Sequence, residues 1–165
     1  MIGTDEQKIY DLLKELQIEY TRYEHKPVYT IDEIKELNLN VPGIQLKNLF
    51  IRNKKGNEHY LVIVEETKKV NLKELSKKIG TSSLSFASEE RLFKYLGVAS
   101  GSVTPFGLIN DTKKCVKVFL DREILNSDKV SFHPNVNTAT VLISSLDFEK
   151  YLKSCQNEFS FIEIN

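Results

Sequence analysis

The sequence lacks tryptophan and contains one methionine, two cysteines, four prolines and seven glycines among its 165 residues. So few glycines and prolines exclude a collagen-like or low-complexity chain. The longest uninterrupted apolar run, residues 60–64, is too short to cross a bilayer. The first ten residues have neither a basic segment nor an apolar one, so no secretory signal is expected. The sequence therefore predicts a cytoplasmic protein without a membrane segment.

Motifs for metals and cofactors are also missing. Cys115 and Cys155 belong to no CxxC pair and to no Cys/His spacing typical of zinc sites, which favours two reduced, half-buried thiols. The sequence contains no P-loop and no GxGxxG, GxSxG or HExxH motif. The sequence therefore has none of the usual signatures of four reaction classes: nucleotide hydrolysis, dinucleotide redox chemistry, serine esterase chemistry and zinc-protease chemistry. We expect neither a metal nor a cofactor.

The composition is that of one folded domain, predicted to cover residues 1–165. Hydrophobic residues make up 41% of the chain, charged residues make up 28%, and the formal net charge is zero, which argues against disorder. The charges are unevenly distributed, because residues 47–78 contain nine basic and four acidic residues. This segment, with a net charge of +5, is either a solvated helix face or a contact for a partner such as RNA.

Helices are predicted from hydrophobic spacing and from capping residues. Thr4 and Thr30 each open a capping box, the first before a helix over residues 5–17 and the second before a short helix that ends near Pro42. Three further helices are predicted: from Asn71 to Gly80, from Ser88 to Gly97, and a last one capped by Ser145.

Extended segments alternate irregularly with these helices. They are predicted at residues 18–25, 46–53, 59–65, 84–86, 106–110, 116–121 and 138–144, with residues 54–57 as a hairpin turn. No interdomain linker and no internal repeat interrupts them. The predicted fold class is α+β: a mixed β-sheet with helices packed on its faces, in a single domain.

Three segments combine polar residues with an unusual setting. In the first, Lys47 and Asn48 begin an otherwise apolar strand that continues through Phe50. Charged side chains are placed in such a strand when they reach solvent or a pocket. The alternatives are a lysine whose stem lies along the strand edge and one that serves a binding site.

The second segment, residues 97–107, brackets small polar residues with glycine and proline. Its backbone N–H groups can approach a ligand closely and can hold a carbonyl or phosphate oxygen without a charged side chain. An ordinary connection from helix to strand is the alternative.

The third segment, residues 132–140, places His133 beside Pro134 and follows them with two Asn and two Thr just before a buried strand. The alternative here is a loop whose Asn and Thr side chains bond their own backbone. His25 and His59 have no comparable neighbours in the sequence, and we interpret both as structural.

Taken together, these segments resemble a known family. Lys47-Asn48-Leu49-Phe50, the Gly101-x-x-x-Pro105 loop, and His133-Pro134 with Asn137-Thr138 resemble the prolyl-tRNA editing (YbaK/ProX-type) aminoacyl-tRNA deacylases. Residues 86–88, 96–98 and 101–111 are similar to its free-standing alanyl-tRNA(Pro) deacylase branch. The resemblance extends from about Tyr10 to about Leu152, whereas residues 156–165 have no counterpart.

The resemblance implies an editing-domain fold and a trans-editing hydrolase that deacylates mischarged tRNA(Pro), most simply Ala-tRNA(Pro), without metal or cofactor. It implies catalytic roles for four residues, of which the lysine and the asparagine would position the ester and the loop backbone would hold the oxyanion: Lys47, Asn48, Gly101 and Ser102. It implies substrate binding by seven others: Phe50, Val103, Thr104, Pro105, His133, Asn137 and Thr138.

The implied partners are the acceptor end of tRNA(Pro) and prolyl-tRNA synthetase, while the sequence does not predict an oligomeric state. Two alternatives stay open at this point. One is a Cys-tRNA(Pro) deacylase, and the other is a non-catalytic RNA-binding or regulatory module with the same fold.

Overall fold

The computed structural model describes residues 2–27 and 43–164. The helix predicted after Thr30, and Pro42 at its end, lie outside these residues.

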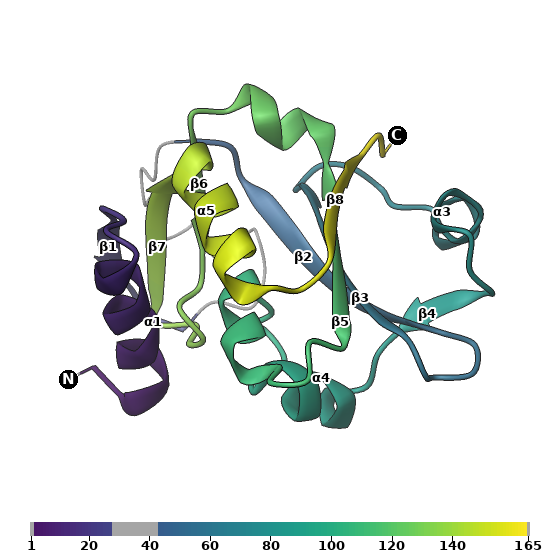
Figure 1. Cartoon of the computed structure of the whole chain (residues 1–165), viewed down its shortest axis with the longest axis horizontal. Coiled ribbons are helices and arrows are strands. Elements are labelled where there is room, and N and C mark those ends of the chain that lie inside the picture. Colours follow the sequence, from purple (N-terminus) through teal and green to yellow (C-terminus); the bar gives the residue numbers. More distant parts are fainter. Residues whose placement is uncertain (1, 28–42, 165) are drawn as a thin grey trace.

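A five-stranded sheet forms the centre of the molecule, with strand order β4-β2-β3-β5-β8 (Figure 1). The antiparallel pairs join β2 (Leu46–Asn53) to β3 (His59–Glu65) and to β4 (Leu84–Phe86), whereas β5 (Val116–Asp121) pairs in parallel with β3 and with β8 (Phe159–Ile162). Strand β3 is central and buried on both faces, which explains its continuous apolar sequence. The predicted mixed sheet is confirmed.

A second, antiparallel sheet lies beside the first, which the sequence analysis did not separate. Its order is β1-β7-β6, with β1 at Thr21–Glu24, β7 at Ala139–Ser144 and β6 at Lys129–Phe132. A parallel bridge from Ile44 to Val130 connects the chain just before β2 to β6. The start of β2 is therefore fixed next to the second sheet.

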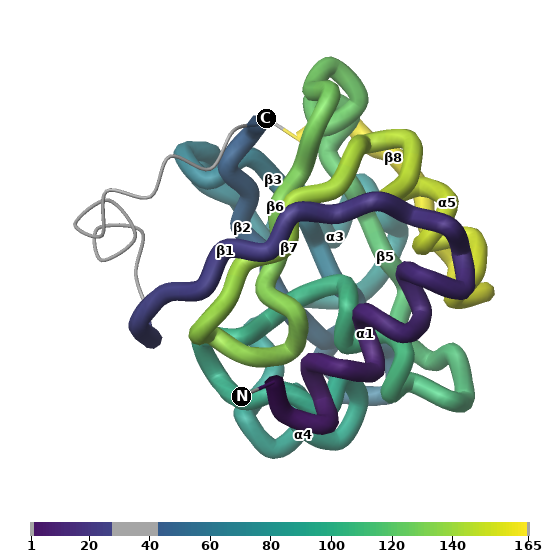
Figure 2. Tube along the Cα trace, turned by 90° about the vertical axis from the view of Figure 1, so that its left-hand side faces the viewer, coloured from purple at the N-terminus to yellow at the C-terminus, as the bar shows by residue number. Residues whose placement is uncertain are grey.

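Four α-helices and two 3-10 helices are found among the described residues: α1 (Thr4–Glu15), α3 (Leu72–Ile79), α4 (Glu89–Leu96), α5 (Ser145–Cys155), η1 (Pro105–Asn110) and η2 (Arg122–Asn126). Figure 1 shows α1 at the left, beside the three-stranded sheet, and α3 at the right-hand side of the molecule. Helix α5 lies in front, between them. In Figure 2, turned by 90°, β1 crosses in front of β7 and β6.

Two hydrophobic clusters lie on opposite faces of β2 and β3. The larger cluster contains Phe50, Phe106, Phe132 and the inward residues of α1, α4 and α5. The smaller one contains Ile51 and the inward residues of α3. Strand alternation sends successive β2 side chains to these two clusters in turn.

Local capping signals identify two helices correctly. The Asn71 side chain accepts a hydrogen bond from the N–H of Glu74 at 3.1 Å, and the Ser88 hydroxyl accepts one from Arg91 at 3.2 Å. Gly97 ends α4 with a φ of +67° and has no space for a Cβ beside Asn110. Such a left-handed residue favours glycine.

Two capping predictions are wrong. Gly3, and not Thr4, is the N-cap of α1, and it offers no side-chain hydrogen bond. Ser144 caps α5 and accepts from the N–H of Asp147 at 3.0 Å, while the predicted cap Ser145 donates its hydroxyl to the carbonyl of Ser127. Adjacent serines look equivalent in sequence, and only the backbone direction decides which one caps.

The strand predicted at residues 106–110 is also wrong, because this stretch is the helix η1. Pro105 at its first turn and the Thr104 hydroxyl, which accepts from the N–H of Phe106 at 3.2 Å, start a helical turn there. Strands β6 and β8 were not predicted, since both are four-residue strands that depend on distant partners. Ile164, which follows β8, belongs to the smaller cluster. Residues 156–165, which have no counterpart in the resemblance to the family, thus contribute to the core.

Candidate functional site

The adjacent residues Lys47 and Asn48 point to opposite faces of β2. Leu49 and Ile51 belong to the smaller cluster, so Lys47 lies on their side, whereas Asn48 lies on the side of Phe50. Their neighbourhood in sequence therefore does not bring the two side chains together.

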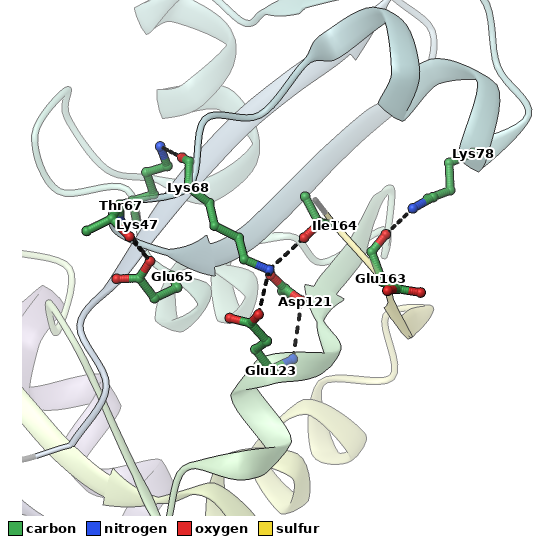
Figure 3. Close-up of polar contacts among 9 residues, drawn as sticks. All are labelled: Lys47, Glu65, Thr67, Lys68, Lys78, Asp121, Glu123, Glu163 and Ile164. Carbon is green, nitrogen blue, oxygen red and sulfur yellow. Dashed lines mark hydrogen bonds and ion pairs between the residues drawn. The ribbon is translucent and has the colours of Figure 1, made fainter.

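Lys47 is half-buried, and its ammonium donates a hydrogen bond to the carbonyl of Lys68 (Figure 3). Within residues 2–27 and 43–164, no carboxylate lies within ion-pair distance of it. A carbonyl satisfies a donor but does not neutralise a charge. Lys47 therefore keeps an uncompensated positive charge.

Phe50 is a core residue. It is 5% exposed and stacks on His59 with ring centroids 5.7 Å apart. Its predicted contact with substrate has no support in the structure. His59 is buried as expected, and burial together with the charges of nearby Arg91, Arg52 and Lys94 lowers its pKa to about 4.

Three asparagines leave buried amide atoms unsatisfied. The Oδ1 atoms of Asn48 and Asn157 and both amide atoms of Asn135 are buried and have no hydrogen-bond partner among the described residues. Asn135 is only 7% exposed and has a φ of +63°. Buried polar groups in proteins nearly always have partners, so each exception needs an explanation, of which a bound water or a bound ligand is one. Asn137, and not Asn135, was predicted to bind substrate. The position of Asn135 directly after Pro134, in a turn where asparagine tolerates a left-handed backbone, is the sequence feature that could have identified it.

The loop before η1 presents backbone donors. Gly101 has a φ of +88°, and the N–H of Ser102 donates to the carbonyl of Ala99 at 3.0 Å. No acceptor among the described residues is found for the N–H groups of Gly101, Val103 and Thr104. Ser102 is therefore committed to its own turn, which corrects its prediction as a backbone donor to the ester, while the N–H groups of half-buried Gly101 and Val103 remain available.

Side chains at the end of this loop are structural. Thr104 is fully buried, with its hydroxyl on the N–H of Phe106, and the Pro105 carbonyl accepts from the Tyr151 hydroxyl at 2.7 Å. The structure therefore gives Thr104 a capping role and leaves no exposed atom of it for its predicted contact with substrate. Pro105 is buried and fixes the loop.

An aromatic cluster holds this loop near the His133 segment. Phe106, just after the loop, meets Phe132, just before His133, edge to face with centroids 6.0 Å apart. Phe132 packs in turn on Phe148 at 4.6 Å. The two predicted segments thus start from the same part of the core.

His133 is half-buried and neutral. Its Nδ1 lies 3.0 Å from the carbonyl of Ala139, an arrangement that requires Nδ1 to carry the proton and leaves Nε2 as an acceptor. Burial lowers the pKa of His133, and the neighbouring His25 adds to this effect. His25, interpreted from sequence as isolated, lies with its ring centroid 6.1 Å from that of His133 and bonds the Thr140 hydroxyl at 2.9 Å.

The remaining predicted residues lie in the same turn. Asn137 and Thr138 are half-buried, and the carbonyl of Thr138 accepts from the N–H of His25 at 2.9 Å. This bond continues the pairing of β1 with β7 and explains why His25 meets His133.

The described part of the chain contains no group of three or more His, Cys, Asp or Glu placed to hold a metal ion. Of the cysteines, predicted to be half-buried, Cys115 is exposed and Cys155 is buried, and burial raises the pKa of the Cys155 thiol. In residues 2–27 and 43–164, no helix has the length and apolar composition needed to cross a membrane.

The chain is similar to known proteins along most of its length. The family model of the aminoacyl-tRNA editing domain matches residues 25–151. The prolyl-tRNA editing protein ProX of Acetoanaerobium sticklandii is 45% identical over 158 residues, which cover 96% of each chain. Prolyl-tRNA synthetase associated domain-containing protein 1 of Danio rerio is 35% identical, over 91% of this chain and 82% of its own.

Solved structures extend the likeness to the fold. The crystal structure of a candidate trans-editing enzyme for prolyl-tRNA synthetase aligns with a TM-score of 0.72 at 17% identity, covering 99% of both chains. That of a hypothetical protein aligns with the same TM-score at 18% identity, covering 95% of this chain and 98% of its own.

Proposed function

This chain belongs to the aminoacyl-tRNA editing domain family, and we propose that it is a trans-editing deacylase that hydrolyses mischarged tRNA(Pro), with Ala-tRNA(Pro) as its substrate. The observation that carries the proposal is its 45% identity to a prolyl-tRNA editing protein along 96% of both chains. The arrangement of unpartnered polar groups around residues 101–104 and 133–135 supports it.

The reaction is the attack of water on the ester that joins the amino acid to the terminal ribose. An aminoacyl ester is already activated, so orientation of water and stabilisation of the oxyanion carry most of the catalysis. The free N–H groups of Gly101 and Val103 are the donors for that oxyanion. Removal of one such donor typically costs about 10²–10³-fold in rate.

The side chains nearby fit roles in binding. Asn48 and Asn135 bring unsatisfied amide atoms, and the Nε2 of neutral His133 is an acceptor for the substrate amine or for water. The 2′-hydroxyl of the ribose delivers the attacking water in this scheme, so no protein base is needed. The uncompensated charge of Lys47 attracts the acceptor-end backbone once its stem leaves the carbonyl of Lys68.

The choice of substrate follows from size. Because one missing methylene changes binding by only about 1–3 kcal/mol, a synthetase pocket for proline also admits smaller amino acids. A second hydrolytic site that excludes proline by its volume corrects this error. Alanine and cysteine both satisfy that condition, and the alanine branch is preferred on the sequence of residues 101–107.

The partners in this proposal are the acceptor end of tRNA(Pro) and prolyl-tRNA synthetase. The name of the Danio rerio relative refers to association with that synthetase. Deacylation in trans requires that the charged tRNA leave the synthetase or be handed over from it.

The test is deacylation of tRNA(Pro) charged with alanine, cysteine or proline, with Ala-tRNA(Ala) as a further control. We expect rapid loss of alanine from tRNA(Pro), stable Pro-tRNA(Pro), and unchanged rates after dialysis against a chelator. Preference for cysteine would transfer the specificity to the Cys-tRNA(Pro) class. No hydrolysis of any substrate would leave an RNA-binding module and would overturn the proposal.

A further inference from the structure

The turn that joins β2 to β3 is held rigidly by Asn53. Its side chain accepts hydrogen bonds from the N–H groups of Asn57 and Glu58 at 3.1 and 3.2 Å and donates to the Asn57 amide oxygen at 2.7 Å. Its carbonyl accepts from the N–H of Gly56 at 3.0 Å. The carbonyl of Gly56 therefore has a fixed position at the end of the sheet.

Arg91 of α4 is anchored to this turn. One of its terminal nitrogens, Nη1, lies 3.0 Å from the Gly56 carbonyl and 3.0 Å from Nε2 of His59. With a pKa of about 4, His59 is neutral at neutral pH, so its Nε2 can accept that bond. Tyr95 packs on the His59 ring at 4.2 Å and keeps it in place.

Two more cations converge on the same point. Around the position that a Gly56 Cβ would occupy, Arg91 nitrogens lie at 2.9 and 3.2 Å and Arg52 Nη1 lies at 3.3 Å. Lys94, one turn after Arg91 on α4, extends over the Tyr95 ring at 5.4 Å from its centroid. Two guanidinium groups and an ammonium thus surround one end of the hairpin.

No anion in residues 2–27 and 43–164 forms an ion pair with this group. In the described residues, none of these cations has a carboxylate within ion-pair distance. Glu58 is bound to the Tyr60 hydroxyl at 2.6 Å and to Lys117, and buried Asp111 accepts from the N–H groups of residues 115 and 116. Glu89 and Glu90 at the start of α4 are exposed and make no ion pair.

We infer that Arg52 and Arg91 form a binding site for a backbone phosphate of RNA, with Lys94 as a third positive charge. Fork-shaped guanidinium groups suit phosphate oxygens, and a pre-anchored pair loses little side-chain freedom on binding. This inference rests on the proposed function and assigns a contact to the same substrate. Arg52 belongs to residues 47–78, the segment with a net charge of +5. The inference therefore assigns RNA binding to one of the basic residues of that segment.

The position of the pair suits an RNA whose 3′ end enters the Gly101 loop. Helix α4 leads from Arg91 to Gly97, which at 1.5 Å per residue is about 9 Å along its axis. A strand with its terminal ester at residues 101–104 would pass the arginine pair with a phosphate upstream of the reacting nucleotide. The pair therefore binds RNA without touching the reacting atoms.

The experiment measures binding of an uncharged tRNA(Pro) acceptor-stem minihelix to the whole chain over a range of salt concentrations. The variants are Arg52→Gln and Arg91→Gln, and the matched control is Lys153→Gln, which removes one charge from the exposed surface of α5. Within residues 2–27 and 43–164 the side chain of Arg52 makes no hydrogen bond or ion pair, and only its backbone is bonded in the sheet, so its variant keeps the test valid if Arg91→Gln fails to fold.

We expect each arginine variant to bind the minihelix about tenfold more weakly and to lower the slope of log K against log salt by about one. Lys153→Gln is expected to stay within twofold of the parent. Hydrolysis of a 3′-alanyl ester of adenosine, which has no upstream phosphate, is expected to be unchanged in Arg52→Gln.

Unchanged minihelix affinity and salt slope in folded Arg52→Gln would overturn the inference. A site that binds free phosphate alone would also overturn it. In that case inorganic phosphate would stabilise the parent but not the variants, while parent and variants would bind RNA equally. If the parent binds the minihelix through this pair but deacylates no substrate, the proposed function fails and the phosphate site stands.

Discussion

The corner between β5, β8 and the residues after β3 differs sharply from the face of β2 that carries Asn48. In the corner, Lys68 pairs with buried Asp121 and with Glu123 at 3.2 Å and donates to the Ile164 carbonyl at 2.6 Å (Figure 3). On the Asn48 face, the Oδ1 of Asn48 is buried without a partner among the described residues. We call the first group the lysine network and the second the unsatisfied face.

The difference separates structure from chemistry. A network whose charges neutralise one another stabilises the fold and has nothing left for a ligand. Unsatisfied buried groups cost stability and are retained where a ligand completes them. Lys47 lies between the two, since it bonds the backbone of the lysine network but has no counter-charge.

The largest expected effect is on stability and belongs to the lysine network. Burial alone would lower the pKa of Lys68, but its hydrogen bonds to Asp121 and Glu123 outweigh this and raise it. Lys68→Ala leaves the carboxylate of Asp121, 2% exposed, without its cation and should lower the free energy of unfolding by about 3 kcal/mol. Lys78→Ala, which removes an exposed lysine, should change it by less than about 0.5 kcal/mol. Urea denaturation of both variants checks this, and equal small losses would show that the network is not a stabilising unit.

Lys47→Ala is expected to lower activity strongly and stability only slightly, in contrast to Lys68→Ala. It should lower kcat for Ala-tRNA(Pro) about a hundredfold, because the positive charge that holds the acceptor end in position is lost. Stability should fall by no more than about 1 kcal/mol, the value of one hydrogen bond. Single-turnover deacylation with the folded variant is the measurement. A parental rate would place Lys47 within the lysine network as a structural residue.

Gly101→Ala is expected to lower both stability and the rate of deacylation. Gly80→Ala is the control, which should lower stability alone. Both glycines have a left-handed φ, +88° and +82°, and a Cβ on Gly80 meets nothing within 4 Å. Each variant should lose about 1 kcal/mol of stability through backbone strain. Only Gly101→Ala should also slow deacylation, by about tenfold or more, since it shifts the N–H donors of the loop. Equal rates in the two variants would remove the loop from the mechanism.

The smallest effect is expected for Asn48→Leu, which replaces an unsatisfied amide with an apolar side chain of similar size. Stability should stay constant or rise slightly, while deacylation should slow about tenfold. Asn157→Leu is the control, because the Oδ1 of Asn157 is also unsatisfied but its Nδ2 donates to Asp111 at 2.9 Å and to the Val116 carbonyl at 2.8 Å. That variant should lose stability and keep its turnover when folded. Loss of stability without loss of activity in Asn48→Leu would make the unsatisfied face merely structural.

Sequence reasoning succeeded where a few neighbouring residues decide the structure. The caps Asn71 and Ser88, and the hairpin of β2 and β3, depend on side chains within a turn of the backbone they bond. It failed where distant segments decide, as in β6 and β8, and where Pro105 and Thr104 turned an apolar stretch into a helix.

The same limit applies to the candidate site. The segments around residues 47, 101 and 133 were found because their residue types are unusual for their surroundings. Alternation along the predicted strand already sends Lys47 and Asn48 to opposite faces, but sequence could not show which cluster covers each face. It could not show that His25 meets His133, because only the pairing of β1 with β7 brings them together.

That pairing has a kinetic consequence. Thr21 lies opposite Leu142, so β1 joins the sheet only after the chain has closed a loop that contains most of the sequence. Contacts so distant in sequence carry a large entropic cost and form slowly. The neighbourhood of His25 and His133 therefore assembles late in folding, after the β2–β3 hairpin and the helices. During refolding from urea, helical signal should return before the ability to cleave an ester.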